Sequence, residues 1–131
     1  MKTTQSPTCV FCSIVAGEAP AEGEAPAEIV REWRDAIAFR PRNPVTPGHV
    51  LVIPREHVAD VGTKPEVSAI AMAAAAELAK ELPSANVITS RGAAATQTVF
   101  HLHLHVVPRE HGDGLPLPWT PQHAAAQRVS G

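Results

Sequence analysis

The alternation of apolar stretches with prolines and polar breaks divides this chain into short extended segments and one long helical segment. Arg34 and Asp35 separate the first two apolar stretches, which predicts two strands joined by a tight turn. The next stretch is short, β-branched and stopped by Pro54, which is typical of a central strand. A loop rich in glycine and alanine at 91–96 precedes the last stretch. The five strand candidates are residues 29–33, 36–39, 49–53, 85–90 and 97–107.

Residues 67–82 are rich in alanine, contain no proline and end at Pro83, so they predict the one long helix. Thr63 and Glu66 are spaced as in a capping box, with Pro65 in the first turn. The segment after Pro108 is rich in proline and glycine and is expected to be irregular. Residues 1–8 and 120–131 are expected to be flexible or irregular ends of a single domain over 1–131.

Composition narrows the class of protein. A chain of 131 residues with 44% hydrophobic residues is long enough for one domain with its own core. The net charge of −2 gives no electrostatic reason to expect a nucleic-acid or membrane-surface binder. No apolar run approaches the length that spans a bilayer, and the first residues lack the apolar core of a secretory signal. We therefore expect a cytoplasmic protein that binds small ligands or protein partners.

A perfect tandem repeat covers residues 17–28, in which Gly-Glu-Ala-Pro-Ala-Glu occurs twice in succession. A period of six that occurs only twice does not predict a solenoid. The favoured interpretation is a duplication that lengthens a surface loop, since loops accept insertions at little cost in free energy.

The most informative pattern is the histidine row His101, His103 and His105. Alternate residues of a strand share a face, so the three imidazoles lie together while the leucines between them face the core. A polar strand face of hydrogen-bonded histidines is one interpretation, but histidine-rich tracts more often bind metal or take part in catalysis. Histidines two apart on a strand can chelate zinc. Alternatively, an imidazole with one nitrogen held by an acceptor can attack phosphorus with the other. The spacing alone fits both chemistries.

Several segments together resemble the histidine triad (HIT) family, in the family's order, over residues 9 to about 110. They are Cys9-Val-Phe-Cys12-Ser-Ile-Val-Ala-Gly, Ala38-Phe39, Asn43-Pro-Val-Thr-Pro-Gly-His49-Val-Leu-Val-Ile-Pro-Arg-Glu-His57, Gln97-Thr-Val-Phe-His101 and His101-Leu-His-Leu-His105-Val-Val. The resemblance is to the bacterial HIT-like nucleotide hydrolases. It implies an α+β fold with a five-stranded antiparallel sheet, one long helix, a short N-terminal helix and pairing into a homodimer.

The resemblance also implies nucleotidyl transfer through a covalent nucleotidyl-histidine, with no metal needed in the chemical step. By motif position, His103 is the expected nucleophile. The expected nucleotide and phosphate contacts are His49, Gln97, Thr98, His105, Phe39 and Asn43. Purine nucleoside phosphoramidates are the first substrate class implied, and dinucleoside polyphosphate hydrolysis or nucleotidyl transfer is the alternative. A non-catalytic nucleotide-binding protein is the alternative from another class.

Cys9 and Cys12 form a Cys-x-x-Cys pair with three interpretations: half of a structural zinc site, a thioredoxin-like redox pair, or two small buried residues. The redox interpretation requires a strand before residue 9 that the sequence does not predict. His57 and His101 are the best candidates to complete a Cys₂His₂ zinc site. Bacterial relatives that resemble this chain carry zinc on the corresponding residues, so structural zinc is the expected cofactor, although His57 taken alone could be a surface residue.

Two positions depart from the family pattern. Pro41 occupies the position of a ribose-binding Asp or Asn, and proline offers neither a side-chain donor nor a carboxylate. Asn43 either substitutes for that residue or only shapes the turn before Pro44. Ser90 stands where an Asn that contacts the phosphate or the leaving group is common, and its side chain is shorter. The resemblance therefore predicts the fold and nucleophile better than the substrate.

Overall fold

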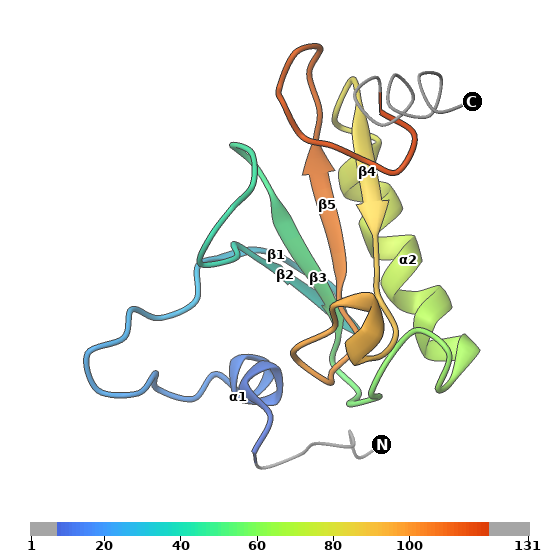
Figure 1. Cartoon of the computed structure of the whole chain (residues 1–131). Helices are drawn as coiled ribbons and strands as arrows, with labels where there is room; N and C mark the ends of the chain where they lie inside the picture. Colours follow the sequence, from blue (N-terminus) through green and yellow to red (C-terminus); the bar gives the residue numbers. More distant parts are fainter. Residues whose placement is uncertain (1–7, 121–131) are drawn as a thin grey trace.

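A computed structural model describes residues 8–120 of the chain, and Figure 1 shows the arrangement of its elements. The expected α+β architecture is confirmed, with five strands, one long helix and one short N-terminal helix. In chain order the elements are α1 (Val10–Ala16), β1 (Ile29–Glu32), β2 (Ala36–Phe39), β3 (Val50–Pro54), α2 (Pro65–Ala79), β4 (Ala85–Ile88), a 3₁₀ turn η1 (Ala93–Ala95) and β5 (Leu104–Pro108).

The five strands form one sheet in the order β1-β2-β3-β5-β4, and every neighbouring pair is antiparallel. The predicted tight turn between β1 and β2 is present, since the Trp33 N–H donates to the Ala36 carbonyl at 2.9 Å across Arg34 and Asp35. The last strand lies between β3 and β4. His105 therefore lies on an interior strand, and His101 and His103 lie just before that strand begins.

One face of the sheet is covered by α2 (Figure 1). Ala71 and Ala75 have no exposed surface, and their small side chains let the helix axis approach the strands closely. Leu102, Leu104 and Val106 pack on this face with at most 1% of their surface exposed. The apolar residues that alternate with the histidines therefore fill the main core, as the sequence predicts.

The opposite face carries a smaller apolar cluster beneath α1. Phe11 from α1 packs there with Phe39 from β2 and Leu51 from β3. His105 lies directly opposite Leu51 in the β3–β5 register, so it projects from the same face. The histidine row and α1 therefore share one side of the sheet, and α2 occupies the other.

The structure corrects two local predictions. Lys64 is the N-cap of α2 and makes no side-chain cap hydrogen bond, while the Thr63 hydroxyl donates to Asp60 Oδ1 at 3.1 Å. The predicted capping box is therefore absent, because Thr63 satisfies the preceding turn instead. The predicted strand over 97–107 begins only at Leu104. Residues 97–103 lack a ladder partner there, although the Leu102 N–H donates to the Val58 carbonyl at 2.8 Å.

Residues 109–120 contain turns but no helix or strand, which agrees with the irregular segment expected after Pro108. The expectations for residues 1–7 and 121–131 lie outside the described residues. Within residues 8–120, no helix combines the length and apolar character required to cross a membrane.

Candidate active site and metal site

His103 is held with one ring nitrogen bonded and the other available. Its Nδ1 lies 2.8 Å from the backbone carbonyl of His101. A carbonyl can only accept, so Nδ1 carries the proton and donates it, and the lone pair remains on Nε2. Burial lowers the pKa of His103, which favours the neutral ring. The edge of the ring packs against Phe11, with centroids 5.2 Å apart. The structure therefore supplies the acceptor that an attacking imidazole requires.

His105 receives its orientation from His49 through a chain of hydrogen bonds that begins at the main chain. The Val45 N–H donates to His49 Nδ1 at 3.1 Å, which leaves the proton of a neutral His49 on Nε2. His49 Nε2 lies 3.0 Å from His105 Nδ1, so it donates there and places the His105 proton on Nε2. His105 therefore presents an N–H donor beside His103, whose ring centroid is 5.3 Å away.

Burial keeps this histidine pair uncharged. Desolvation, followed by the charges of His103 and His49, lowers the pKa of His105 to about 4. Desolvation also lowers the pKa of His49, whose side chain is 3% exposed. The resemblance implied a direct phosphate contact for His49, but both of its ring nitrogens have protein partners here. The position of His49 suits it to orient His105.

Gln97 is buried beneath the loop that precedes the histidine row. Its Oε1 accepts from the Gly92 N–H at 2.8 Å. Its Nε2 donates to the carbonyls of Ala59 and Val99 at 2.8 and 3.0 Å. The amide that was expected to hold phosphate oxygens is therefore engaged with backbone, and it fixes the shape of the loop. Thr98, the next residue, is exposed.

We expect Gln97→Leu to lower the free energy of unfolding by about 2–3 kcal/mol, because it leaves buried backbone groups without partners. Thr98→Ala removes an exposed side chain next to it and should change stability by less than about 0.5 kcal/mol. Urea unfolding of both variants measures the difference. Equal stabilities would show that the Gln97 hydrogen bonds do not hold the loop.

Thr96 ends the 3₁₀ turn η1 with φ of 75°, and among residues 8–120 no other non-glycine residue has a positive φ. A β-branched residue is strained in this left-handed region. We expect Thr96→Gly to raise the free energy of unfolding by about 1 kcal/mol. The neighbouring Ala95→Gly should lower it by about 0.5–1 kcal/mol, because it only adds backbone entropy. Urea unfolding distinguishes the two signs, and a loss of stability in Thr96→Gly would contradict strain at this position.

Cys9, Cys12, His57 and His101 come together at the N-terminal end of α1. Cys9 is the N-cap and accepts from the Cys12 N–H, so both sulfurs lie on the same side of the helix start. Each of the four residues offers one possible ligand atom, and these four atoms all lie within 4.8 Å of one another. Cys12 Sγ is 3.2 Å from His57 Nδ1, and both sulfurs are 3.5 Å from His101 Nδ1. The four residues predicted as zinc ligands thus form one cluster.

The cluster is close in size to a tetrahedral zinc site, with four of its six ligand-atom separations at 3.2–3.5 Å, and it has the proton position on His101 that such a site requires. Bonds of about 2.0 Å to nitrogen and 2.3 Å to sulfur give tetrahedron edges of about 3.3–3.8 Å. The two ring nitrogens are 3.2 Å apart. His101 Nε2 lies 2.9 Å from the Pro54 carbonyl, so it carries the proton and Nδ1 is free to bind metal. Burial lowers the pKa of His101 to about 4, which keeps it neutral, as a ligand must be.

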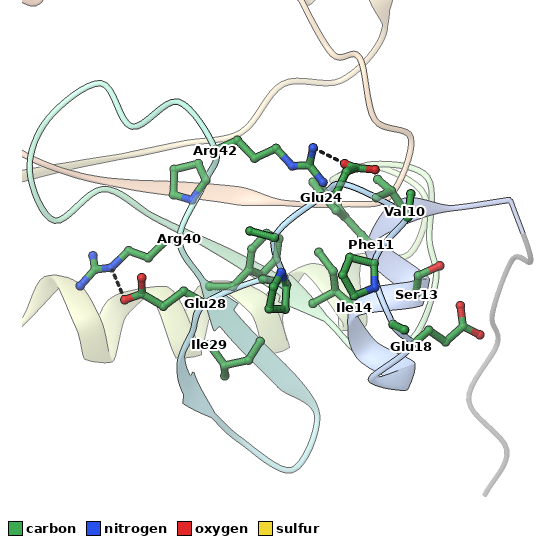
Figure 2. Close-up of a pocket in the computed structure, with 18 of the residues that line it drawn as sticks. Val10, Phe11, Ser13, Ile14, Glu18, Glu24, Glu28, Ile29, Arg40 and Arg42 are labelled. Atoms are coloured by element: carbon green, nitrogen blue, oxygen red, sulfur yellow. Dashed lines mark ion pairs between the residues drawn. The ribbon is translucent and has the colours of Figure 1, made fainter.

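A cavity of about 1160 Å³ lies on the side of the sheet that carries α1 (Figure 2). Its floor is the sheet face carrying Phe39 and Leu51, one wall is α1, and the outer wall is the segment 17–28. Phe11 lines the cavity and also contacts His103, so the cavity and the reactive ring share this side chain. A nucleoside fits in the volume, since pockets for small ligands occupy about 300–1,000 Å³.

The remaining predicted residues divide between this cavity and the surface. Phe39 lines the cavity, 3% exposed, with its ring centroid 5.4 Å from that of Phe11. Pro41 also lines it. Asn43 is exposed and is not among the cavity-lining residues, which favours the interpretation that it shapes the turn. Ser90 is half-buried at the start of the loop before η1.

The model of the HIT domain family matches residues 22–112, a span that contains β1 to β5 and all three histidines of the row. The chain belongs to the HIT domain family. The resemblance drawn from the sequence motifs is thereby confirmed.

Relatives within the HIT family agree with this assignment. An uncharacterised HIT-like protein of Mycobacterium tuberculosis is 40% identical over 116 residues, which cover 82% of this chain and 75% of that protein. An adenosine 5′-monophosphoramidase of Saccharomyces cerevisiae is 34% identical over 123 residues, covering 91% of this chain and 74% of the enzyme. The crystal structure of a zinc-bound histidine triad family protein from Mycobacterium smegmatis aligns with a TM-score of 0.73 and 38% identity, covering 93% of this chain and 89% of that one.

Sequence reasoning missed the contribution of the segment 17–28 to the cavity. The repeat was interpreted as a surface loop, and its residues are indeed exposed, yet nearly all of them line the cavity. The glutamates of the repeat and the arginines at 40 and 42 carry opposite charges, and two ion pairs join these segments. Charge complementarity between distant segments is visible in a sequence only once the fold is known.

Proposed function

We propose that this protein cleaves nucleoside 5′-phosphoramidates, or related nucleotide conjugates, through a covalent nucleotidyl-histidine on His103. The observation that carries the proposal is the hydrogen bond from His103 Nδ1 to the His101 carbonyl. It leaves a neutral ring whose Nε2 lone pair is the only free nucleophilic atom of His103. The similarity to a yeast adenosine 5′-monophosphoramidase supports the substrate class.

His105 is suited to stabilise the charge that develops on the phosphate. Its proton lies on Nε2 because His49 donates to its Nδ1. A donor positioned in advance on a half-buried ring stabilises a transition state without reorganisation. His49 then acts as a positioning residue, and Gln97 and the backbone of the 92–98 loop hold the surrounding structure.

The proposed reaction has two displacement steps at the α-phosphorus. In the first, His103 Nε2 forms a bond to phosphorus while the phosphorus–nitrogen bond of the substrate breaks, and the leaving amine takes up a proton. In the second, water attacks phosphorus, the bond to His103 breaks, and a nucleoside monophosphate and a proton are released. The sum is one phosphoramidate and one water converted to an amine and a nucleoside monophosphate, and no metal takes part in either step.

We propose a structural role for a zinc ion bound by Cys9, Cys12, His57 and His101. The zinc would supply a cross-link between α1 and the segment that carries His103. The zinc-bound M. smegmatis relative supports this choice of metal. Pairing into a homodimer stays a prediction from the resemblance.

A substrate panel combined with trapping tests the proposed function. The purified protein is mixed with adenosine phosphoramidate, guanosine phosphoramidate or a diadenosine polyphosphate, and the products are separated by chromatography. Rapid denaturation at neutral or alkaline pH, followed by mass spectrometry, should show a nucleoside monophosphate attached to the peptide containing His103. Cleavage of the dinucleotide but not of the phosphoramidates would assign the alternative enzyme class. Tight nucleotide binding without any adduct or product would instead indicate a binding protein.

A further inference from the structure

The cavity on the α1 side of the sheet has an unequal distribution of polar groups. Its sheet side is formed by apolar side chains and Pro41, which offer no side-chain acceptor for a hydroxyl group. Three glutamates line it, Glu18, Glu24 and Glu28, and all belong to the tandem repeat at 17–28. Every carboxylate at this cavity, among the described residues, is therefore supplied by the duplicated segment.

The two copies of the repeat have different structural roles. The glycine that opens the first copy, Gly17, ends α1 in the left-handed conformation with φ of 70°. The glycine that opens the second, Gly23, has φ of 82° in a turn closed by a hydrogen bond from the Glu24 N–H to the Ala21 carbonyl at 2.9 Å. The second copy thus turns the chain back over the cavity and places Glu24 at its wall.

Two ion pairs attach the second copy to the strand end after β2. Arg42 pairs with Glu24, and Arg40 pairs with Glu28 at 3.8 Å. In the view of Figure 2 the two ion pairs lie apart, with Glu24 drawn toward Val10 and Phe11, which line the same cavity. The Glu24 side chain is 37% exposed, compared with 76% for Glu28. Glu24 is therefore the less exposed of the two carboxylates.

The position of Phe11 decides which carboxylate can meet the sugar of a nucleotide. Phe11 contacts His103, so the end of the cavity near Phe11 is nearest to the reacting phosphorus. In a nucleotide the ribose is bonded directly to the phosphate, and the base lies farther away. We therefore place the ribose of a substrate at His103 toward Glu24 rather than toward Glu28.

We propose that Glu24 is a specificity-determining residue that accepts hydrogen bonds from the ribose hydroxyls of the nucleotide, with Arg42 holding its carboxylate in place. This inference rests on the proposed function and names how the same site selects its substrate. The guanidinium of Arg42 also offsets the negative charge of Glu24, so that an anionic nucleotide is not repelled. The duplication thereby supplies a carboxylate for the sugar at a cavity where Pro41 offers none.

Binding of AMP and of 2′-deoxyAMP, measured by isothermal titration calorimetry, tests this inference without requiring catalysis. The wild type should bind AMP about tenfold more tightly than 2′-deoxyAMP, the factor expected for one hydrogen bond to a charged acceptor. Glu24→Gln should lose most of this preference while its affinity for 2′-deoxyAMP changes less than about threefold. Arg42→Gln should shift the preference in the same direction, because it releases the carboxylate.

Glu22→Gln is the matched control, since Glu22 belongs to the repeat but does not line the cavity. It should keep the wild-type preference for AMP. Deletion of residues 23–28 gives a further variant, identical to deletion of 17–22 because the copies are identical, and it should lose the preference as Glu24→Gln does. Equal thermal unfolding midpoints for Glu24→Gln and the wild type would show that the fold is retained.

The outcomes separate this inference from the proposed function. An unchanged AMP preference in Glu24→Gln, or no preference in the wild type, overturns the role of Glu24 and leaves the His103 chemistry unaffected. Binding with the expected preference but no adduct on His103 overturns the enzymatic proposal and keeps the sugar contact. If the wild type binds neither nucleotide, both proposals fail together.

Discussion

Replacing His103 with alanine should lower kcat for a nucleoside phosphoramidate by about 10⁴–10⁶-fold, the range seen when a nucleophile is removed from an enzyme that forms a covalent intermediate. The reason is geometric. The His101 carbonyl directs the only free lone pair of this ring, and the neighbouring His105 has its Nδ1 occupied by His49. No second imidazole of the row is available to replace it. Single-turnover kinetics with mass spectrometry of the quenched protein measures both the rate and the adduct.

Two controls make this result decisive. His111→Ala removes an exposed histidine outside the site and should retain full activity. His103→Gly leaves a space for free imidazole, so added imidazole should restore part of the turnover while no adduct forms on the protein. Turnover of His103→Ala within about tenfold of the wild type would contradict the covalent mechanism, because a residue that only binds phosphate has an effect of that size.

Removal of the bound metal should have the largest effect on stability. We expect the purified protein to contain about one equivalent of zinc and to lose about 4 kcal/mol of unfolding free energy in EDTA, relative to free zinc at about a thousand times its Kd. Without metal, the two sulfurs and two ring nitrogens lie within 4.8 Å of one another and have no cation to coordinate. Elemental analysis and urea unfolding with and without zinc measure the two quantities.

Cys12→Ser tests whether the effect comes from this cluster. The variant should be as unstable in zinc as the wild type is in EDTA, and added metal should no longer stabilise it. Ser13→Ala, the adjacent position in α1, should keep the zinc response, although its hydroxyl donates to the Cys9 carbonyl at 3.3 Å. A wild-type protein that purifies without zinc and gains no stability from it would contradict the metal site.

The sequence predicts those parts of the fold that depend on local patterns. Strands β1 to β4 and the alanine-rich helix are found within three residues of their predicted bounds, because apolar periodicity and proline define them. The start of β5 was placed seven residues too early. Residues 97–103 look extended in the sequence, but the Gln97 amide bonds to the Gly92, Ala59 and Val99 backbones and holds the segment outside the ladder.

In the candidate site, too, the sequence predicts some features and only the structure shows the others. The motif predicts which histidines take part in the chemistry. The Cys9–Cys12 pair, together with the resemblance, predicts four metal ligands, and the structure brings these four residues together. Which ring nitrogen carries the proton depends on the carbonyls of His101 and Pro54 and on the amide of Val45. These groups are present in every residue, so no sequence pattern marks them. The assignment of His49 to positioning follows only from the three-dimensional arrangement.

The hydrogen-bonded chain from Val45 through His49 to His105 begins at a backbone amide. Proton conduction along such a chain requires each member to accept on one side while it donates on the other. An amide N–H has no lone pair to accept with, and it does not titrate in the pH range of proteins. This series of hydrogen bonds therefore does not conduct protons. It orients the His105 N–H, but it cannot return a proton to His105 after that proton has been donated. A proton that reaches the leaving amine therefore does not arrive through His49 and Val45.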